Sequence, residues 1–318
     1  MKIILRISFF IFISAKLFAQ NPIIANKLIY LDSMWVPSTP DNYKYTRLIE
    51  EYYSNKKSYI YKDYYKSGAI KYIATTLDKD IIINEGQTVS YYENGNKKST
   101  VTYVKTKKTG TEFNWYENGD IKSDIVYSED KKGKTQQKIN NFWNPQKERT
   151  VTDGNGYYED KNKNSEESGQ IKNGEPDGVW KGKDFKKKTS FTENYENGKL
   201  VSGVSKDSLN TEYPYTIVDQ RPTPKQGINS FYSYVGKSLY IPVEARNKVS
   251  GKIYLTFIVD KDGSLIEPKI LKGVGHGLDE SAITVIKHAK KWNPGIRRGI
   301  PVRVLYSLPI TIQTASKT

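Results

Sequence analysis

A short motif returns at a nearly fixed interval along the first two thirds of the chain, and it constrains the fold more than any other feature. The copies read YYKSGAIK at residues 64–71, YYENGNKK at 91–98 and WYENGDIK at 115–122. Their second aromatic residues, Tyr65, Tyr92 and Tyr116, are 27 and 24 residues apart. A period of this length is typical of a repeat architecture.

Each copy has the chemistry of a β-hairpin. Aromatic residues end one strand, Asn-Gly or Ser-Gly reverses the chain because glycine tolerates positive φ, and an alternating strand follows. A lone hairpin cannot bury its aromatic face, so neighbouring hairpins must stack. We therefore expect a β-rich repeat sheet over residues 45–205, with a weaker copy at 194–201 and a degenerate copy at Trp143, 27 residues after Tyr116. The polar stretch 131–168 is expected to hold a long loop or decayed copies.

The copies resemble the MORN-variant repeats of the YwqK-like antitoxin family. The resemblance is clearest at 91–98 and 115–122, and NGEPDGVWKG at 173–182 fits the same pattern. Such repeats are generic scaffolds, so the resemblance implies a fold and leaves the function open. If the repeats bind a partner themselves, the candidate contacts are aromatic: Tyr91, Tyr92, Trp115, Tyr116 and Tyr195.

The stretch GKIYLTFIVDKDGS at 251–264 has the period of a strand that runs into a turn. Its Asp260-Lys261-Asp262-Gly263 segment is open to three interpretations: a hairpin turn, a calcium loop or the start of a known module. A calcium loop needs oxygen ligands spread over about 12 residues and ending in Glu. Strand residues follow Gly263 instead, so we expect a hairpin turn with Gly263 at positive φ.

The rest of the C-terminal third predicts a small α+β unit. Residues 264–272 form a second strand, which Pro268 restricts to an edge or a bulge because proline has no N–H. Residues 278–289 have helical spacing, and residues 302–312 alternate as a last strand. This order predicts one antiparallel sheet with helices on one face. The chain as a whole is then expected to be mainly β.

Three separated segments, GKIYLTFIVDKDGSL, GLDESAITVIKHAKKWNPG and GIPVRVLYSLPITI, resemble the C-terminal domain of TonB. The resemblance covers residues 217–313. It implies a domain from 217 to 318, preceded by a proline-containing linker at 206–216. The family usually has Gly-Gly and Tyr-Pro where this chain has Gln226-Gly227 and Ile241-Pro242. The residues that carry the motif are Pro242, Ala245, Gly251, Leu278, Asp279, Ala282, Trp292, Pro294 and Pro309.

This resemblance implies a binding function. TonB-like domains add an extended peptide as a strand to an exposed sheet edge, and the peptide belongs to an outer-membrane transporter. The candidate edge is the last strand, 301–312, where Arg303 and Ser307 are the polar residues able to tune specificity. Its candidate binding residues are Val302, Arg303, Val304, Leu305, Tyr306 and Ser307. Alternatively the strand is capped within the chain or by a second copy, which allows a homodimer.

The N-terminus, MKIILRISFFIFISAKLFAQ, has the layout of a secretory signal peptide over residues 1–19. Residues 20–44 then form a lead-in to the repeats. We expect the periplasm or the periplasmic face of the outer membrane; the alternative is an uncleaved inner-membrane anchor. A TonB-type energy transducer has a membrane helix and a long Pro-rich spacer, so we do not expect this chain to transmit proton-motive force.

Composition excludes several classes of site. The chain has no cysteine, so disulfides and thiolate zinc sites are excluded, and two histidines, His276 and His288, do not make a metal site alone. We expect no cofactor and no metal. The formal charge of +15 would suggest nucleic acid, but an exported protein seldom meets it, so contact with anionic envelope surfaces or plain solubility is the better explanation.

An enzyme is not expected. No serine lies in a Gly-x-Ser-x-Gly elbow, and the paired carboxylates Glu166 and Glu167 lie in polar sequence that reads as a loop. Two functions remain. The first is recognition of a TonB-dependent outer-membrane receptor or another envelope protein through the C-terminal domain. The second is a structural, surface-interaction or immunity-like role of the repeats.

Overall fold

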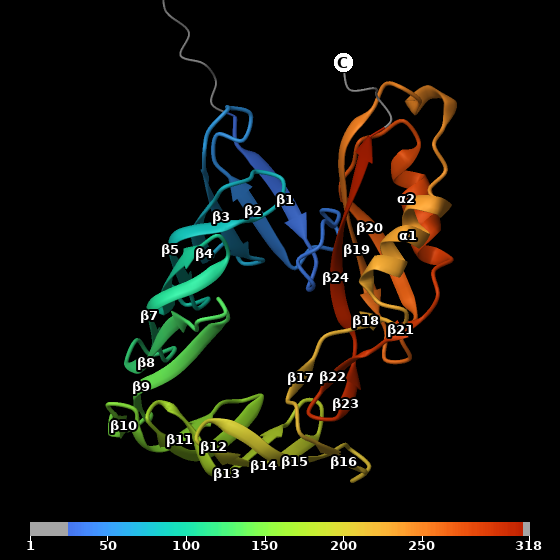
Figure 1. The fold of residues 1–318 in the computed structure, drawn as a ribbon. Helices are drawn as coiled ribbons and strands as arrows, with labels where there is room; N and C mark the ends of the chain where they lie inside the picture. Colours follow the sequence, from blue (N-terminus) through green and yellow to red (C-terminus); the bar gives the residue numbers. More distant parts are fainter. Residues whose placement is uncertain (1–24, 314–318) are drawn as a thin grey trace, which may run out of the picture.

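The computed structural model describes residues 25–313, so the predicted signal peptide lies outside the described residues. The protein is mainly β (Figure 1). A long curved sheet forms an arc, and a smaller domain with two α-helices lies between the ends of the arc. Within the described part of the chain, no helix is long and apolar enough to cross a membrane.

The arc is one antiparallel sheet of sixteen strands that pair in sequence order. It starts with β1 (Lys27–Leu31) inside the predicted lead-in and ends with β16 (Glu212–Tyr215) inside the predicted linker, so it is longer than 45–205. The strands between them are β2 (Tyr45–Ile49), β3 (Tyr59–Tyr65), β4 (Ile70–Thr76), β5 (Asn84–Tyr91), β6 (Lys97–Val104), β7 (Lys107–Trp115), β8 (Ile121–Glu129), β9 (Thr135–Trp143), β10 (Arg149–Thr152), β11 (Asn155–Lys161), β12 (Ser165–Lys172), β13 (Glu175–Asp184), β14 (Thr189–Glu196) and β15 (Lys199–Lys206). The stretch 131–168 therefore holds β9, β10, β11 and the start of β12, and no long loop.

The copies share one turn. The Tyr92 carbonyl accepts the Gly95 N–H, the Tyr92 N–H donates to Asn96, and Gly95 has φ 88°. The same pair of bonds closes the turns at Gly68 and Gly119. In the fourth copy Lys147 takes the glycine position at φ 66° and Asn144 takes the position of the second aromatic residue. Trp143 thus corresponds to Trp115, one position away from the alignment with Tyr116 that the sequence suggested.

The second aromatic residue of each copy ties it to the next. The hydroxyls of Tyr65, Tyr92 and Tyr116 donate to the backbone carbonyls of Tyr91, Trp115 and Trp143, at 2.9, 2.8 and 2.7 Å. A tyrosine at this position packs its ring between hairpins and still satisfies its polar end. The periodic tyrosines are therefore explained by the stacking of neighbouring units.

One face of the sheet carries a continuous row of cross-strand neighbours, and we call it the inner face. Directly opposed residues lie on the same face of a sheet. The row begins with Arg47, Asp63, Tyr72, Ser90, Ser99, Asn114, Ser123 and Phe142. Ring contacts from Phe142 through Tyr158 to Trp180 continue it. Glu193, which lies opposite Trp180, and Tyr215 complete it.

The C-terminal domain has a three-stranded antiparallel sheet in the order β20 (Leu265–Lys272), β19 (Ser250–Val259), β24 (Val304–Gln313). Helices α1 (Ile228–Ser238) and α2 (Leu278–Lys287) pack on one face of it. As Pro268 predicts, β20 lies at an edge and its pairing with β19 is bulged. The core residues from both layers include Phe231, Val235, Leu255, Phe257, Ala282, Ile286, Trp292, Leu308 and Ile310.

Two features of this domain were not predicted. Helix α1 precedes Pro242, whereas the chain after Pro242 forms only a single 3-10 turn, Val243–Ala245. Five short strands also link the domain to its surroundings. They are β17 (Asp219–Gln220), β18 (Thr223–Pro224), β21 (Trp292–Asn293), β22 (Gly295–Arg297) and β23 (Ile300–Val302).

Candidate functional site: an open strand edge and a domain junction

Strand β24 has one paired side and one open side. It pairs with β19 along its whole length, from Val304 opposite Val259 to Gln313 opposite Ser250. Among the residues that the structure describes, no strand pairs with its other side. An edge strand of ten residues presents a row of backbone N–H and C=O groups that another chain can pair with.

The predicted edge residues are divided between two elements. Val304, Leu305, Tyr306 and Ser307 lie in β24, as predicted. Val302 lies in β23, which turns away to pair with β22, so it is not on the open edge. Arg303 lies between the strands and forms ion pairs, at 2.9 Å with Glu267 and 3.6 Å with Asp260. The strand predicted over 301–312 is therefore interrupted at Arg303.

The side chains of β24 alternate between the two faces of its sheet. Tyr306 packs on the helix side, with its ring 4.9 Å from Trp292 and 5.4 Å from Phe257. Leu305, Ser307 and Pro309 are exposed. Proline has no N–H and is restricted to positions where the ladder needs none. Pro309 therefore indicates that the N–H groups of residues 305, 307 and 311 point away from β19, because backbone direction alternates along a strand.

The motif residues of the domain have structural roles. The Asp279 carboxylate accepts the N–H groups of Val274 and Gly275, each at 3.0 Å, and so holds the loop before α2. Gly251 lies against Val274. The others are Ala245, Leu278, Ala282 and Trp292 in the core, Pro242 at the start of the 3-10 turn, Pro294 between β21 and β22, and Pro309 in β24.

The Asp260–Gly263 segment is a hairpin turn, and the prediction of positive φ at Gly263 is confirmed at 85°. The Gly263 carbonyl accepts the Trp292 N–H at 2.8 Å, so the turn anchors β21. Lys291 pairs with the Asp262 carboxylate and, with bonds from Ser264, holds its pKa well below the usual range. No cluster of potential metal ligands occurs among residues 25–313.

A second candidate site is the junction between the domain and the repeat sheet. The β22–β23 hairpin inserts Arg298 into the inner face, where its Nε lies 2.8 Å from Glu193 Oε1. The guanidinium also lies 3.4 Å from the centre of the Phe191 ring. Both backbone polar groups of Arg298 are hydrogen-bonded. Its N–H donates to the Val218 carbonyl, and its carbonyl accepts the Ser205 hydroxyl.

The junction supplies a charge that the sheet itself lacks. Glu193 has a side chain only 1% exposed, and a buried carboxylate needs a partner. The other two buried carboxylates of the sheet are paired from within it: Arg47 pairs with Asp63 at 2.7 Å and Lys108 with Glu112 at 2.8 Å. For Glu193 the cation comes from the other domain. Arg298 was not among the predicted site residues. The signal in the sequence was the Arg298-Gly299 pair, which forms a two-residue turn in the structure with φ of 50° and 77°.

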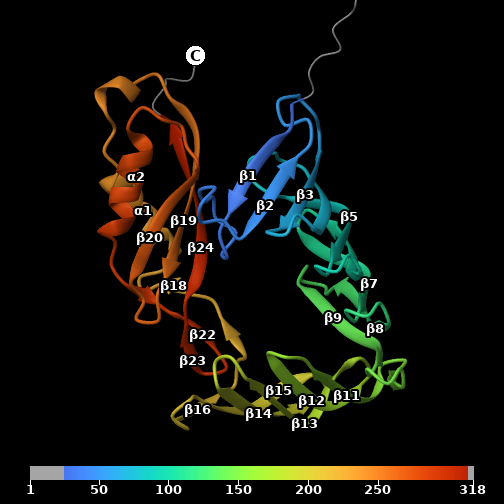
Figure 2. The ribbon, with the colours of Figure 1, turned by 180° about the vertical axis from the view of Figure 1, so that it is seen from behind.

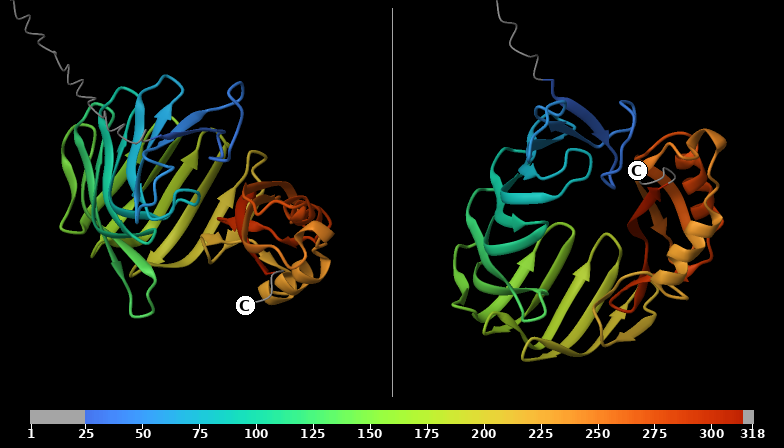
Figure 3. Two further views of the ribbon diagram at one scale, coloured as in Figure 1. Left: turned by 90° about the horizontal axis from the view of Figure 1, so that it is seen from above. Right: turned by 45° about the horizontal axis from the view of Figure 1, so that its top comes forward.

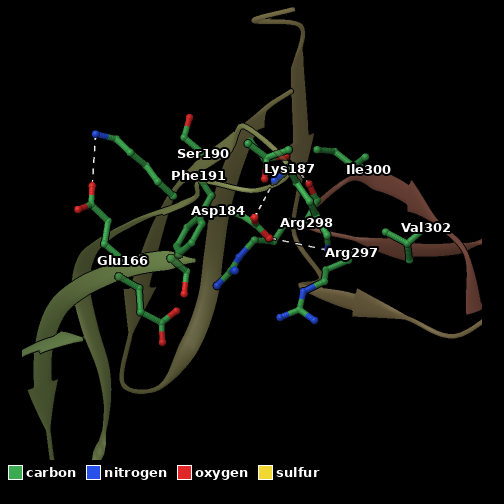
Figure 4. A pocket seen from close by; sticks show the side chains of 14 residues that line it. Glu166, Asp184, Lys187, Ser190, Phe191, Arg297, Arg298, Ile300 and Val302 are labelled. Atoms are coloured by element: carbon green, nitrogen blue, oxygen red, sulfur yellow. Dashed lines mark hydrogen bonds and ion pairs between the residues drawn. The ribbon is translucent and has the colours of Figure 1, made fainter. Parts of the chain in front are cut away.

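A pocket of about 270 Å³ lies beside this junction (Figure 4). Its walls come from β12 to β15 on one side and from Arg297, Ile300 and Val302 on the other. Glu166 and Glu167 line it and lie in β12, not in a loop as predicted. Glu166 pairs with Lys161 and Lys183, each at 3.3 Å, whereas burial raises the pKa of Glu167.

The other end of the sheet also contacts the C-terminal domain. Lys272 of β20 pairs with Asp80 at 2.8 Å, and Lys269 pairs with Asp32 at 3.5 Å. The first hairpins thus lie against the sheet of the C-terminal domain, as seen from behind in Figure 2. The arc and the domain together close a ring, which Figure 3 shows from a tilted direction.

Most of the aromatic residues that were predicted to contact a partner make contacts within the protein instead. Tyr92 and Tyr116 donate to neighbouring copies, and Tyr195 donates to Glu193 at 3.1 Å. The Trp115 ring lies 6.4 Å from the ring of Phe113. Tyr91 alone of the five lines a hollow of the inner face.

Comparison with known proteins identifies the family of the C-terminal domain. Residues 238–311 match the family model of the Gram-negative bacterial TonB protein C-terminal. A search of curated proteins finds none that matches the chain. The match runs from the end of α1 into β24 and includes most of the open strand. Residues 238–311 of the chain therefore form a TonB C-terminal domain.

Proposed function

We propose that the protein is a non-enzymatic component of the envelope that recognises another protein by strand addition at β24. The observation that carries this proposal is the unpaired side of β24 over residues 304–313. The partner is an extended segment of a TonB-dependent outer-membrane receptor or of another envelope protein. Main-chain hydrogen bonds supply the affinity in this mode, so side chains need only fit.

The architecture favours recognition over energy coupling. The repeat sheet holds the domain at two places, through Arg298 and through Lys272. A domain held in this way is suited to presenting its strand edge at a fixed orientation. We propose that the chain is exported through a cleaved signal peptide at 1–19 and acts in the periplasm or at the periplasmic face of the outer membrane.

The test removes one backbone donor from the open edge. Ser307→Pro deletes an N–H that points away from β19, so the domain should fold and lose at least about tenfold in affinity for its peptide. Ser307→Ala is the matched control, because it removes the side chain and keeps the N–H. Binding of peptides from the periplasmic segments of outer-membrane receptors is measured by fluorescence anisotropy. Equal loss in both variants, or in neither, would contradict strand addition.

The same edge could pair with a second copy of the chain, and the test separates the two cases. Sedimentation of the unliganded protein that shows a dimer for the parent and a monomer for Ser307→Pro would assign β24 to self-association. Partner binding that survives in Ser307→Pro would favour the alternative function, in which the repeats bind the partner.

A further inference from the structure

A hollow of about 400 Å³ lies on the inner face of the first hairpins, at the opposite end of the sheet from Arg298. Aromatic side chains, hydroxyls and cations line it together, and they include Trp35, Tyr72, Tyr91, Ser90, Ser99 and Lys98. Aliphatic side chains are scarce among its lining residues, so it does not have the character of an apolar docking groove.

A row of lysines runs along this face, one from each copy of the motif. Lys71, Lys98 and Lys122 are the last residues of the three motifs, and each lies at a register shift in the pairing of its hairpin. Their ammonium groups lie over the rings of the tyrosines of the same copies, at 4.6, 5.5 and 5.5 Å from the ring centres. The row of lysines therefore follows from the repetition of the motif.

Two of these lysines have no counter-charge of their own. Lys122 pairs with Asp160 at 2.7 Å. Within residues 25–313, neither Lys71 nor Lys98 has a carboxylate at ion-pair distance, although both line the hollow. Burial lowers the pKa of Lys71 and the charge of Lys98 lowers it further, whereas the charges of Asp63 and Glu93 act in the opposite direction.

The whole hollow has an excess of positive charge. Its lining holds four cations, Arg47, Lys71, Lys98 and Lys108, and two carboxylates, Asp63 and Glu112, which leaves a net charge of two positive. The two carboxylates are occupied by Arg47 and Lys108. An anionic group entering the hollow would therefore meet the two unpaired lysines.

Trp35 adds an aromatic platform at the edge of the hollow. The residue is 39% exposed, and its ring stacks on Tyr45 with 4.5 Å between ring centres. Its backbone is held at φ 64°, an uncommon conformation for a bulky side chain. Such a ring offers a flat face to the C–H groups of a sugar, while Ser90 and Ser99 offer hydroxyls for hydrogen bonds.

We propose that the inner face of the first hairpins binds a linear acidic saccharide, whose acid groups are taken by Lys71 and Lys98 and whose rings lie on Trp35 and the neighbouring tyrosines. These lysines lie on β4 and β6, two strands apart, which corresponds to about 10 Å across the sheet. This spacing is comparable with the length of a disaccharide, so a chain with one acid per disaccharide matches the row.

The test uses the full mature chain and a matched pair of sugars. A hexasaccharide of alternating glucuronate and N-acetylglucosamine is titrated by calorimetry beside the neutral N-acetylglucosamine hexamer, hexaglutamate and inorganic phosphate. We expect saturable binding of the acidic sugar and an increase in Kd of about tenfold or more in Lys71→Met/Lys98→Gln. Lys97→Gln removes the same charge from a neighbouring residue outside the hollow and should leave Kd unchanged.

The remaining outcomes would overturn the proposal. Equal affinity for the neutral hexamer would remove the role of the lysines, and equal affinity for hexaglutamate or for phosphate would remove the role of the sugar. Absence of binding by the acidic hexasaccharide to a parent protein with an intact thermal transition would refute the site. Lys98→Gln alone, at an exposed position, keeps the test valid if the double variant does not fold.

Discussion

Replacing Arg298 by Met should open the junction between the two domains. Met keeps an aliphatic stem over Phe191 and removes the charge, so Glu193, with its 1% exposed side chain, loses its cation. Breaking one partner of a buried pair costs about 3 to 5 kcal/mol. Because the Arg298 side chain is 23% exposed, we expect the lower end of this range. Arg298→Lys, which keeps a charge, should recover part of the loss.

A double-mutant cycle with Glu193→Gln isolates the pair. Tyr195 and Tyr215 donate to different oxygens of the native carboxylate, at 3.1 and 2.8 Å. In the glutamine variant the amide oxygen can accept one of these hydroxyls and the amide NH2 can donate to the other, so the fold of the last strands is kept. With the carboxylate neutralised, Arg298→Met should cost much less, and the coupling energy should be about 2 kcal/mol.

Hydrogen exchange is the appropriate assay, because a chain with two domains need not unfold in one step. Arg298→Met should lower the free energy of opening for amides of β14–β16 and of the β22–β23 hairpin, and leave β3–β6 unchanged. A coupling energy below about 0.5 kcal/mol, or unchanged exchange at the junction, would refute the reasoning.

Two further predictions concern stability. Burial raises the pKa of Glu167 above 4.5, so its ionised form opposes folding at neutral pH. Glu167→Gln should therefore raise the melting temperature at pH 7, and this gain should fade as the pH falls through the raised pKa and vanish below 4.5, where the parent carboxyl is protonated in both states. Gly95 and Gly263 take the same position in two turns of the same kind, with φ of 88° and 85°. A Cβ at Gly263 would clash with the Trp292 carbonyl, whereas a Cβ at Gly95 would meet no neighbouring atom. Gly95→Ala should cost about 1 kcal/mol in urea unfolding and Gly263→Ala clearly more; equal costs would contradict the role of the clash.

Local patterns in the sequence were sufficient for the repeated units. The Asn-Gly turns, the helix over α2 and the turn at Gly263 depend on residues within one hairpin or one helix, and all three occur as expected. The continuation of the sheet into β1 and β16 was not predicted, because neither strand carries a copy of the motif. Their pairing is imposed by the edges that the neighbouring hairpins leave open.

The interruption of the last strand has a similar origin. Val302, Val304 and Tyr306 continue one period-two pattern, so the sequence alone predicts one strand. The structure breaks it at Arg303 because residues 300–302 pair with β22 and residues 304–313 pair with β19. Arg298 and Glu193 are 105 residues apart, and no local pattern predicts that they meet.

The two closures of the ring differ in strength, and this difference determines how the ring can open. At the first hairpins, Lys272 and Asp80 are 42% and 21% exposed, and Lys269 and Asp32 are 46% and 26% exposed, so each pair contributes at most about 1 kcal/mol. At the last hairpins, Glu193 is buried and Arg298 has additional backbone and ring contacts. Opening at Asp80 and Lys272 is therefore the less costly motion. It would leave the C-terminal domain attached through Arg298 and would separate the first hairpins from the sheet of that domain.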